Sequence, residues 1–103
     1  MKKLNLSVLD RLMLQQLLPE HGGKIEMILA GSIATKVEFS ADEIAKFGLK
    51  DHNGSVSWNN SIDTEYEFTP EQVELLKSAS KRADEEKKIT RDNLPLIDKI
   101  DNL

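Results

Sequence analysis

The sequence contains no cysteine and only two histidines, His21 and His52. Disulfide bonds and thiolate metal ligands are therefore excluded. A zinc or iron site would have to rely mainly on carboxylates, which is an unusual donor set for these metals. We therefore expect neither a metal ion nor any other cofactor.

Long apolar runs are also missing, because no stretch approaches the roughly 18 apolar residues that cross a bilayer. Lys2 and Lys3 precede a leucine-rich run, but Asn5 and Asp10 interrupt it, which argues against a signal peptide. Apolar residues make up 39% and charged residues 31% of the 103 positions, which is typical of one globular domain. We expect a single soluble domain over residues 1–103, located in the cytoplasm and without a membrane partner.

A basic surface is not evident from the sequence. The net charge is −4, and the pairs Lys81-Arg82 and Lys87-Lys88 flank three acidic residues at 84–86. Affinity for nucleic acid comes largely from lysine and arginine at phosphates. The composition therefore disfavours nucleic acid as a partner.

Catalytic motifs are absent as well. There is no glycine-rich phosphate loop and no nucleophile elbow. The loop that starts at Asp51 has Val56 and Ile62 where a calcium loop needs glycine and glutamate. We expect His21 to stabilise a helix end rather than to act as a base. The sequence predicts no enzyme and no catalytic residue.

Apolar residues at helical spacing predict most of the secondary structure. The region 24–36 fits a helix, although its alternation around Gly31 also fits a hairpin. Gly48 is placed to end a short helix. The predicted helices cover residues 4–18, 24–36, 41–47, 70–88 and 90–100.

Two segments of the sequence echo one another at an offset of 29 residues, from Val37 and from Tyr66. Each predicts a capping box and a hydrophobic staple that starts a helix. We interpret the echo as repeated use of a good helix start rather than as a duplication, and a fainter third instance begins at Ile89-Thr90. The boxes are Ser40 with Glu43 and Thr69 with Gln72, and the staples bring Ile44 (from Phe39) and Val73 (from Phe68) into the core.

Alternating residues predict a small sheet. Asn53-Gly54 is a strong turn signal. Residues 55–58 and 64–68 read as the two strands of a hairpin, and 37–39 as a third strand. The expected fold class is α+β, with four or five helices and a two- or three-stranded antiparallel sheet.

The first predicted helix contains more leucine than one core face needs. Leu12, Leu14 and Leu18 widen its apolar side and form a possible interaction face for a second copy or another protein. Our first hypothesis is therefore a small non-enzymatic interaction or accessory protein. The alternative is a winged-helix-like nucleic-acid-binding or regulatory module, which the order of elements fits. Its recognition helix would be 41–47, which offers DNA only one basic residue, Lys46.

Short motifs spread over most of the chain resemble those of small uncharacterised proteins of bacterial or prophage origin. The resemblance implies no activity and no functional residue. The motifs are Asp10-Arg11, Leu17-Leu18-Pro19, Val37-Glu38-Phe39, Val56-Ser57-Trp58-Asn59 and Phe68-Thr69.

Overall fold

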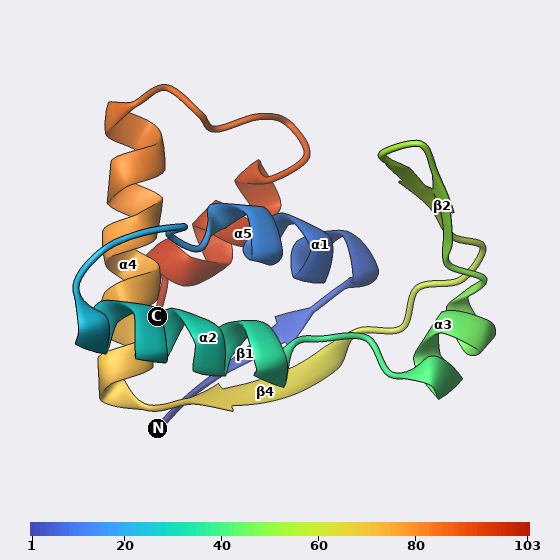
Figure 1. Ribbon diagram of the computed structural model, residues 1–103, viewed down its shortest axis with the longest axis horizontal. Helices are drawn as coiled ribbons and strands as arrows, with labels where there is room; N and C mark the ends of the chain where they lie inside the picture. Colours follow the sequence, from blue (N-terminus) through green and yellow to red (C-terminus); the bar gives the residue numbers. More distant parts are fainter.

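The computed structural model describes all 103 residues, as five helices and four strands in two antiparallel sheets (Figure 1). The predicted α+β class is confirmed. None of the helices is both long and apolar enough to cross a membrane. In chain order the elements are β1 (Lys2–Leu6), α1 (Val8–Leu17), α2 (Lys24–Lys36), α3 (Ala41–Phe47), β2 (Lys50–His52), β3 (Ser55–Ser57), β4 (Thr64–Phe68), α4 (Pro70–Glu85) and α5 (Leu94–Asp101).

The start of the first helix was predicted wrongly. Residues 2–6 form a strand in which Leu4 and Leu6 are buried while their neighbours are exposed. Ser7 then forms a capping box with Asp10, and α1 begins at Val8. The leucines of β1 and those of α1 together have helical spacing. The sequence pattern therefore predicted one helix where the chain forms a strand followed by a helix.

The strand pairing also differs from the prediction. β4 pairs antiparallel with β1, 58 positions earlier in the register Leu6 to Thr64, rather than with the segment after Asn53-Gly54. That turn instead closes a local hairpin of β2 and β3, with both turn residues at positive φ. The expected strand at 37–39 does not form, because Val37 ends α2 as its C-cap.

Two lysine side chains occupy the open edges of the β1–β4 ribbon. The Lys99 ammonium donates to the Asn5 carbonyl of β1 at 2.8 Å, and the Lys36 ammonium donates to the Glu67 carbonyl of β4 at 2.5 Å. Exposed edges invite pairing with other strands, and lysine on an edge opposes it. These contacts explain why the ribbon stays two-stranded.

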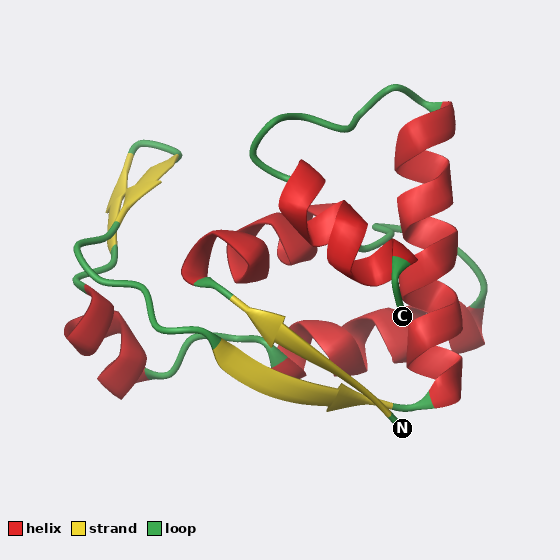
Figure 2. Cartoon of the chain, turned by 180° about the vertical axis from the view of Figure 1, so that it is seen from behind, coloured by secondary structure: helices red, strands yellow, loops and turns green.

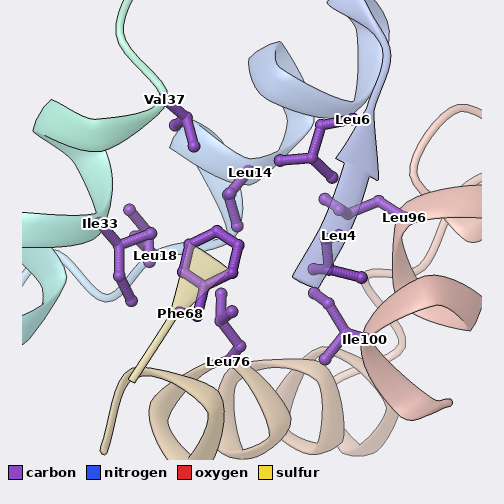
Figure 3. Close-up of a cluster of buried hydrophobic side chains, with 10 residues drawn as sticks. All are labelled: Leu4, Leu6, Leu14, Leu18, Ile33, Val37, Phe68, Leu76, Leu96 and Ile100. Carbon is purple, nitrogen blue, oxygen red and sulfur yellow. The ribbon is translucent and has the colours of Figure 1, made fainter. Parts of the chain in front are cut away.

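The core lies between this ribbon and helices α1, α2, α4 and α5 (Figure 3). Phe68 of β4 is fully buried at its centre, with side chains from every one of these helices around it. The core side chains are Leu4, Leu6, Leu14, Leu18, Ile33, Val37, Phe68, Leu76, Leu96 and Ile100.

The helix over 24–36 is confirmed, and so are the capping boxes at Ser40 and Thr69. The box expected at Thr90 makes its reciprocal bonds with Asn93, but α5 begins only after that turn. The longest helix ends at residue 85, three residues before the predicted end.

One of the two predicted staples was wrong. Val73 packs against the core, but Ile44 remains 45% exposed. The reason is that α3 does not lie against the core at all. It stands apart from the four-helix body together with the β2–β3 hairpin (Figure 2). We call residues 40–63 the arm.

Candidate functional site

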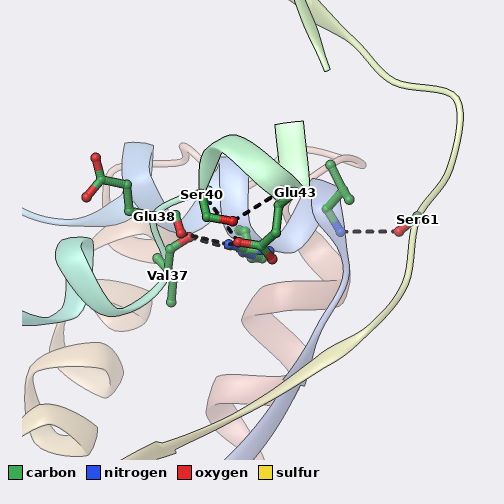
Figure 4. A network of polar contacts seen from close by, with 7 residues as sticks. Val37, Glu38, Ser40, Glu43 and Ser61 are labelled. Atoms are coloured by element: carbon green, nitrogen blue, oxygen red, sulfur yellow. Dashed lines mark hydrogen bonds and ion pairs between the residues drawn. The ribbon is translucent and has the colours of Figure 1, made fainter. Parts of the chain in front are cut away.

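A buried arginine joins the arm to the body of the protein through its bonds to Val37, Glu38 and Glu43, which Figure 4 shows with their hydrogen bonds. Arg11 of α1 is 1% exposed. Its Nε donates to the Val37 carbonyl at 3.0 Å, and its Nη2 donates to the Glu38 carbonyl at 2.9 Å. Nη1 and Nη2 hold the two carboxylate oxygens of Glu43 at 2.6 and 3.1 Å.

Arg11 lies where two helix ends meet. The carbonyls of Val37 and Glu38 follow the last turn of α2, where backbone acceptors lack partners and the helix dipole is negative. Glu43 lies in the first turn of α3 and accepts from the Ser40 amide at 3.0 Å. The guanidinium therefore stabilises the end of α2 and neutralises the carboxylate that starts α3.

The charge of Glu43 is strongly favoured in this setting. The pKa of Glu43 is lowered from 4.5 to about 2, mainly by the side-chain hydrogen bonds from Arg11 and against the opposing effect of burial. The amide of Ser40 contributes to the same lowering. The ion pair is therefore fully formed at neutral pH.

Aromatic rings enclose the arginine. Its Cζ lies 3.9 Å from the ring centre of Phe39 and 5.6 Å from that of Tyr66. The rings of Phe39 and Phe47 of α3 meet edge to face, with their centres 6.5 Å apart. Burial raises the pKa of the Tyr66 phenol, and the positive charge of Arg11 opposes this rise. These rings cover the buried guanidinium, and the contact between Phe39 and Phe47 extends the cluster into the arm.

The rest of the arm makes few bonds to the body. Ser61 accepts from the Val8 amide at 3.3 Å, and the other arm bonds are internal, such as Asn59 to the Phe47 carbonyl. The arm contains two lysines and four carboxylates, so its surface is not basic. Its hairpin follows α3 as a wing would, but it lacks the charge with which a wing meets phosphate.

A second feature is the outer face of α2, which we define as Ile25, Ile28, Gly31, Ser32 and Thr35. All five are exposed, and none is charged. Ile25 is 76% and Ile28 61% exposed, more than any other isoleucine, leucine or valine of the chain. The opposite side of α2 is apolar too, since Ala30 and Ile33 are buried against the body.

The predicted interaction face is corrected in part. Leu14 and Leu18 are buried in the core of this chain, because α1 packs on β1, α4 and α5 at once. Of the three, only Leu12 remains partly exposed. It lines a shallow hollow of about 440 Å³ with Phe39 and Thr35, beside the outer face of α2.

Neither histidine takes part in the hydrogen bonds of the arginine cluster. His21 lines an open hollow of about 810 Å³ between the end of α1 and α4, with Arg82 and Glu86 across from it. His52 is exposed at the end of β2. No group of three or more histidine or acidic side chains is placed to bind a metal ion.

No protein-family model, no characterised protein and no solved structure matches this chain.

We expect Arg11→Lys to destabilise the fold and to loosen the arm. One ammonium cannot serve two carbonyls and a bidentate carboxylate together, so the free energy of unfolding should fall by about 2–4 kcal/mol. Trp58 is the only tryptophan and belongs to the arm, so its emission should shift to the red. Urea unfolding and fluorescence measure both effects. Exposed Arg82→Lys is the control, and an Arg11→Lys variant indistinguishable from it would contradict the anchor.

Replacing Glu43 by glutamine separates its charge from its capping bond, because glutamine also completes a capping box. The lowered pKa means that ionised Glu43 stabilises the fold above about pH 4.5, and that this contribution is lost as the pH falls toward 2. With 27% of the side chain exposed, solvent screening leaves about 1–2 kcal/mol.

Urea unfolding at several pH values should therefore show Glu43→Gln less stable than the wild type at pH 7 and nearly equal to it near pH 2.5. Asp42→Asn removes a neighbouring exposed carboxylate that makes no ion pair and should leave the pH profile unchanged. A constant difference between wild type and Glu43→Gln at all pH values would show that the charge does not matter.

Proposed function

We propose that this chain is a small non-enzymatic interaction or accessory protein, which binds another polypeptide through the outer face of α2. The observation that carries the proposal is that α2 has large apolar side chains, Ile25 and Ile28, on its solvent-facing side as well as Ala30 and Ile33 on its buried side. A surface helix normally confines its apolar residues to the side that faces the core, so apolar residues on the exposed side indicate a further contact. With 13 residues, α2 is too short to be covered by a membrane core instead.

Two further features support binding at this face. The hollow lined by Leu12 and Phe39 extends it toward α1, so that the apolar surface is wider than one helix. Arg11 fixes the end of α2 against α1 and the arm, so that the face is presented on a rigid support. Rigid presentation lowers the entropy lost on binding.

We also propose the compartment and the origin expected above: the protein acts in the cytoplasm of a bacterium, and its gene belongs to the bacterium or to a prophage. The support for this origin is the resemblance carried by the short motifs from Asp10-Arg11 to Phe68-Thr69. The absence of a stabilising disulfide from a chain of this size is compatible with a reducing compartment.

The chain lacks cysteine, so a single introduced cysteine can carry a photoreactive maleimide at one chosen position. We expect Thr35→Cys, at the edge of the outer face, to crosslink to a distinct polypeptide that mass spectrometry identifies. The polypeptide is either a second copy or a different chain. Thr35 is exposed, so the change should leave the fold intact.

The matched control is Ser78→Cys, which lies exposed on α4. It should give no adduct or only diffuse ones under the same illumination. If both positions gave the same products, or if neither gave any, the outer face of α2 would not be a binding face and the proposed function would fail.

A further inference from the structure

We propose that a second copy of this chain covers the outer face of α2, with the two α2 helices packed antiparallel. This inference rests on the proposed function and names the partner. The spacing of side chains on the face, the charges at its two ends and the glycine within it support this dimer.

The exposed side chains of α2 have the spacing of a helix–helix contact. Ile25, Ile28, Ser32 and Thr35 follow one another by three, four and three residues, which is the a and d spacing of a coiled coil. In an antiparallel pair centred on the level of residue 30, Ile25 of one copy meets Thr35 of the other. Ile28 then meets Ser32. Large side chains thus face small ones at every level, and the face is complementary to itself.

Two unpaired charges flank the face. Lys24 is the first residue of α2 and Glu38 follows its C-cap, both exposed and neither in an ion pair within the chain. Each has the unfavourable sign for its own end of the helix dipole. The Glu38 side chain points away from the Arg11 network (Figure 4).

The antiparallel arrangement reverses both of these charge effects. It brings Lys24 of one copy to the C-terminal end of the other α2, near Glu38 of that copy. The offset between them is two residues, about 3 Å along the axis, which a lysine side chain spans. By the two-fold symmetry this contact forms twice.

Gly31 lies beside this row of side chains, and no contact within one copy requires a glycine there. Nothing in the chain lies within 4 Å of the position that a Cβ would take there, and the residue is helical. Glycine inside a helix lowers its stability relative to alanine. Between two helices, the missing side chain lets the backbones approach closely.

The contact is small. A helix of 13 residues is about 20 Å long and about 10 Å across, so α2 and the adjoining hollow offer less than the roughly 800 Å² per partner of a standard stable interface. We therefore expect a reversible dimer that forms in the micromolar to millimolar range rather than a permanent one.

Sedimentation equilibrium from about 10 μM to about 1 mM brackets this affinity. The wild-type chain should show a monomer–dimer equilibrium, and Ile28→Glu should weaken it about 100-fold because the substitution acts twice in each dimer. Ile62→Glu, on the arm and 49% exposed, is the matched control and should leave the equilibrium unchanged. A monomeric wild type up to about 1 mM, or equal loss in both variants, would overturn the inference.

Charge exchange tests the antiparallel arrangement. Lys24→Glu alone and Glu38→Lys alone each place like charges at both contacts and should weaken the dimer about tenfold at low salt. An equimolar mixture of the two variants, and the double variant, should both recover wild-type affinity. Within one copy the two positions are too far apart to interact directly, so recovery reports a contact between copies. Loss without recovery would exclude this arrangement.

The outcomes also separate this inference from the proposed function. A wild-type monomer whose Thr35→Cys probe still crosslinks to a different polypeptide would overturn the dimer and leave the interaction function standing. A monomer without any position-specific adduct would overturn both.

Discussion

The guanidinium of Arg11 is the interaction on which the arrangement of this protein depends. It ties three parts of the chain that are distant in sequence: α1, the end of α2 and the start of α3. It makes four hydrogen bonds, and no buried side-chain polar atom of the chain, its own included, lacks a partner. A buried charge is tolerated only when it is paired and fully hydrogen-bonded, and here two orphan carbonyls and one carboxylate meet that condition.

Polar contacts also prevent further strands from adding to the β1–β4 ribbon. Lys36 and Lys99 occupy edge carbonyls of the β1–β4 ribbon, and each is held in place by a further partner, Gln72 for the one and Asp10 for the other. The ribbon therefore offers no free edge at these carbonyls. The outer face of α2 differs from the edges of the ribbon, because no charged side chain lies at its centre.

Local signals in the sequence predicted local structure well. The capping boxes at Ser40 and Thr69, the turn at Asn53-Gly54 and the stop at Gly48 all act over a few residues, and each lies where it was expected. Long-range pairing was not predictable in the same way. β4 prefers a strand near the N-terminus over its neighbour in sequence, because only the former also buries Leu4 and Leu6.

The candidate site shows the same division. Arg11 reads as one more polar residue of a surface helix, and nothing local indicates that it is buried among partners 26 to 32 positions away. The high leucine content of α1 predicted an exposed interaction face there, but β1, α4 and α5 cover Leu14 and Leu18. The sequence signal for an exposed apolar face was in α2, where Ile25 and Ile28 add apolar surface to a helix whose buried side already contains Ala30 and Ile33.

The proposed role of α2 as a self-complementary binding face is tested most directly by NMR of the unmodified protein over a dilution series. Amide signals of Ile25, Ile28, Ser32 and Thr35 should move with concentration, while those of core residues such as Phe68 stay constant. Shifts confined to this one face would agree with two copies meeting through α2. Spectra that do not change with concentration, or that change mainly in the arm, would contradict it.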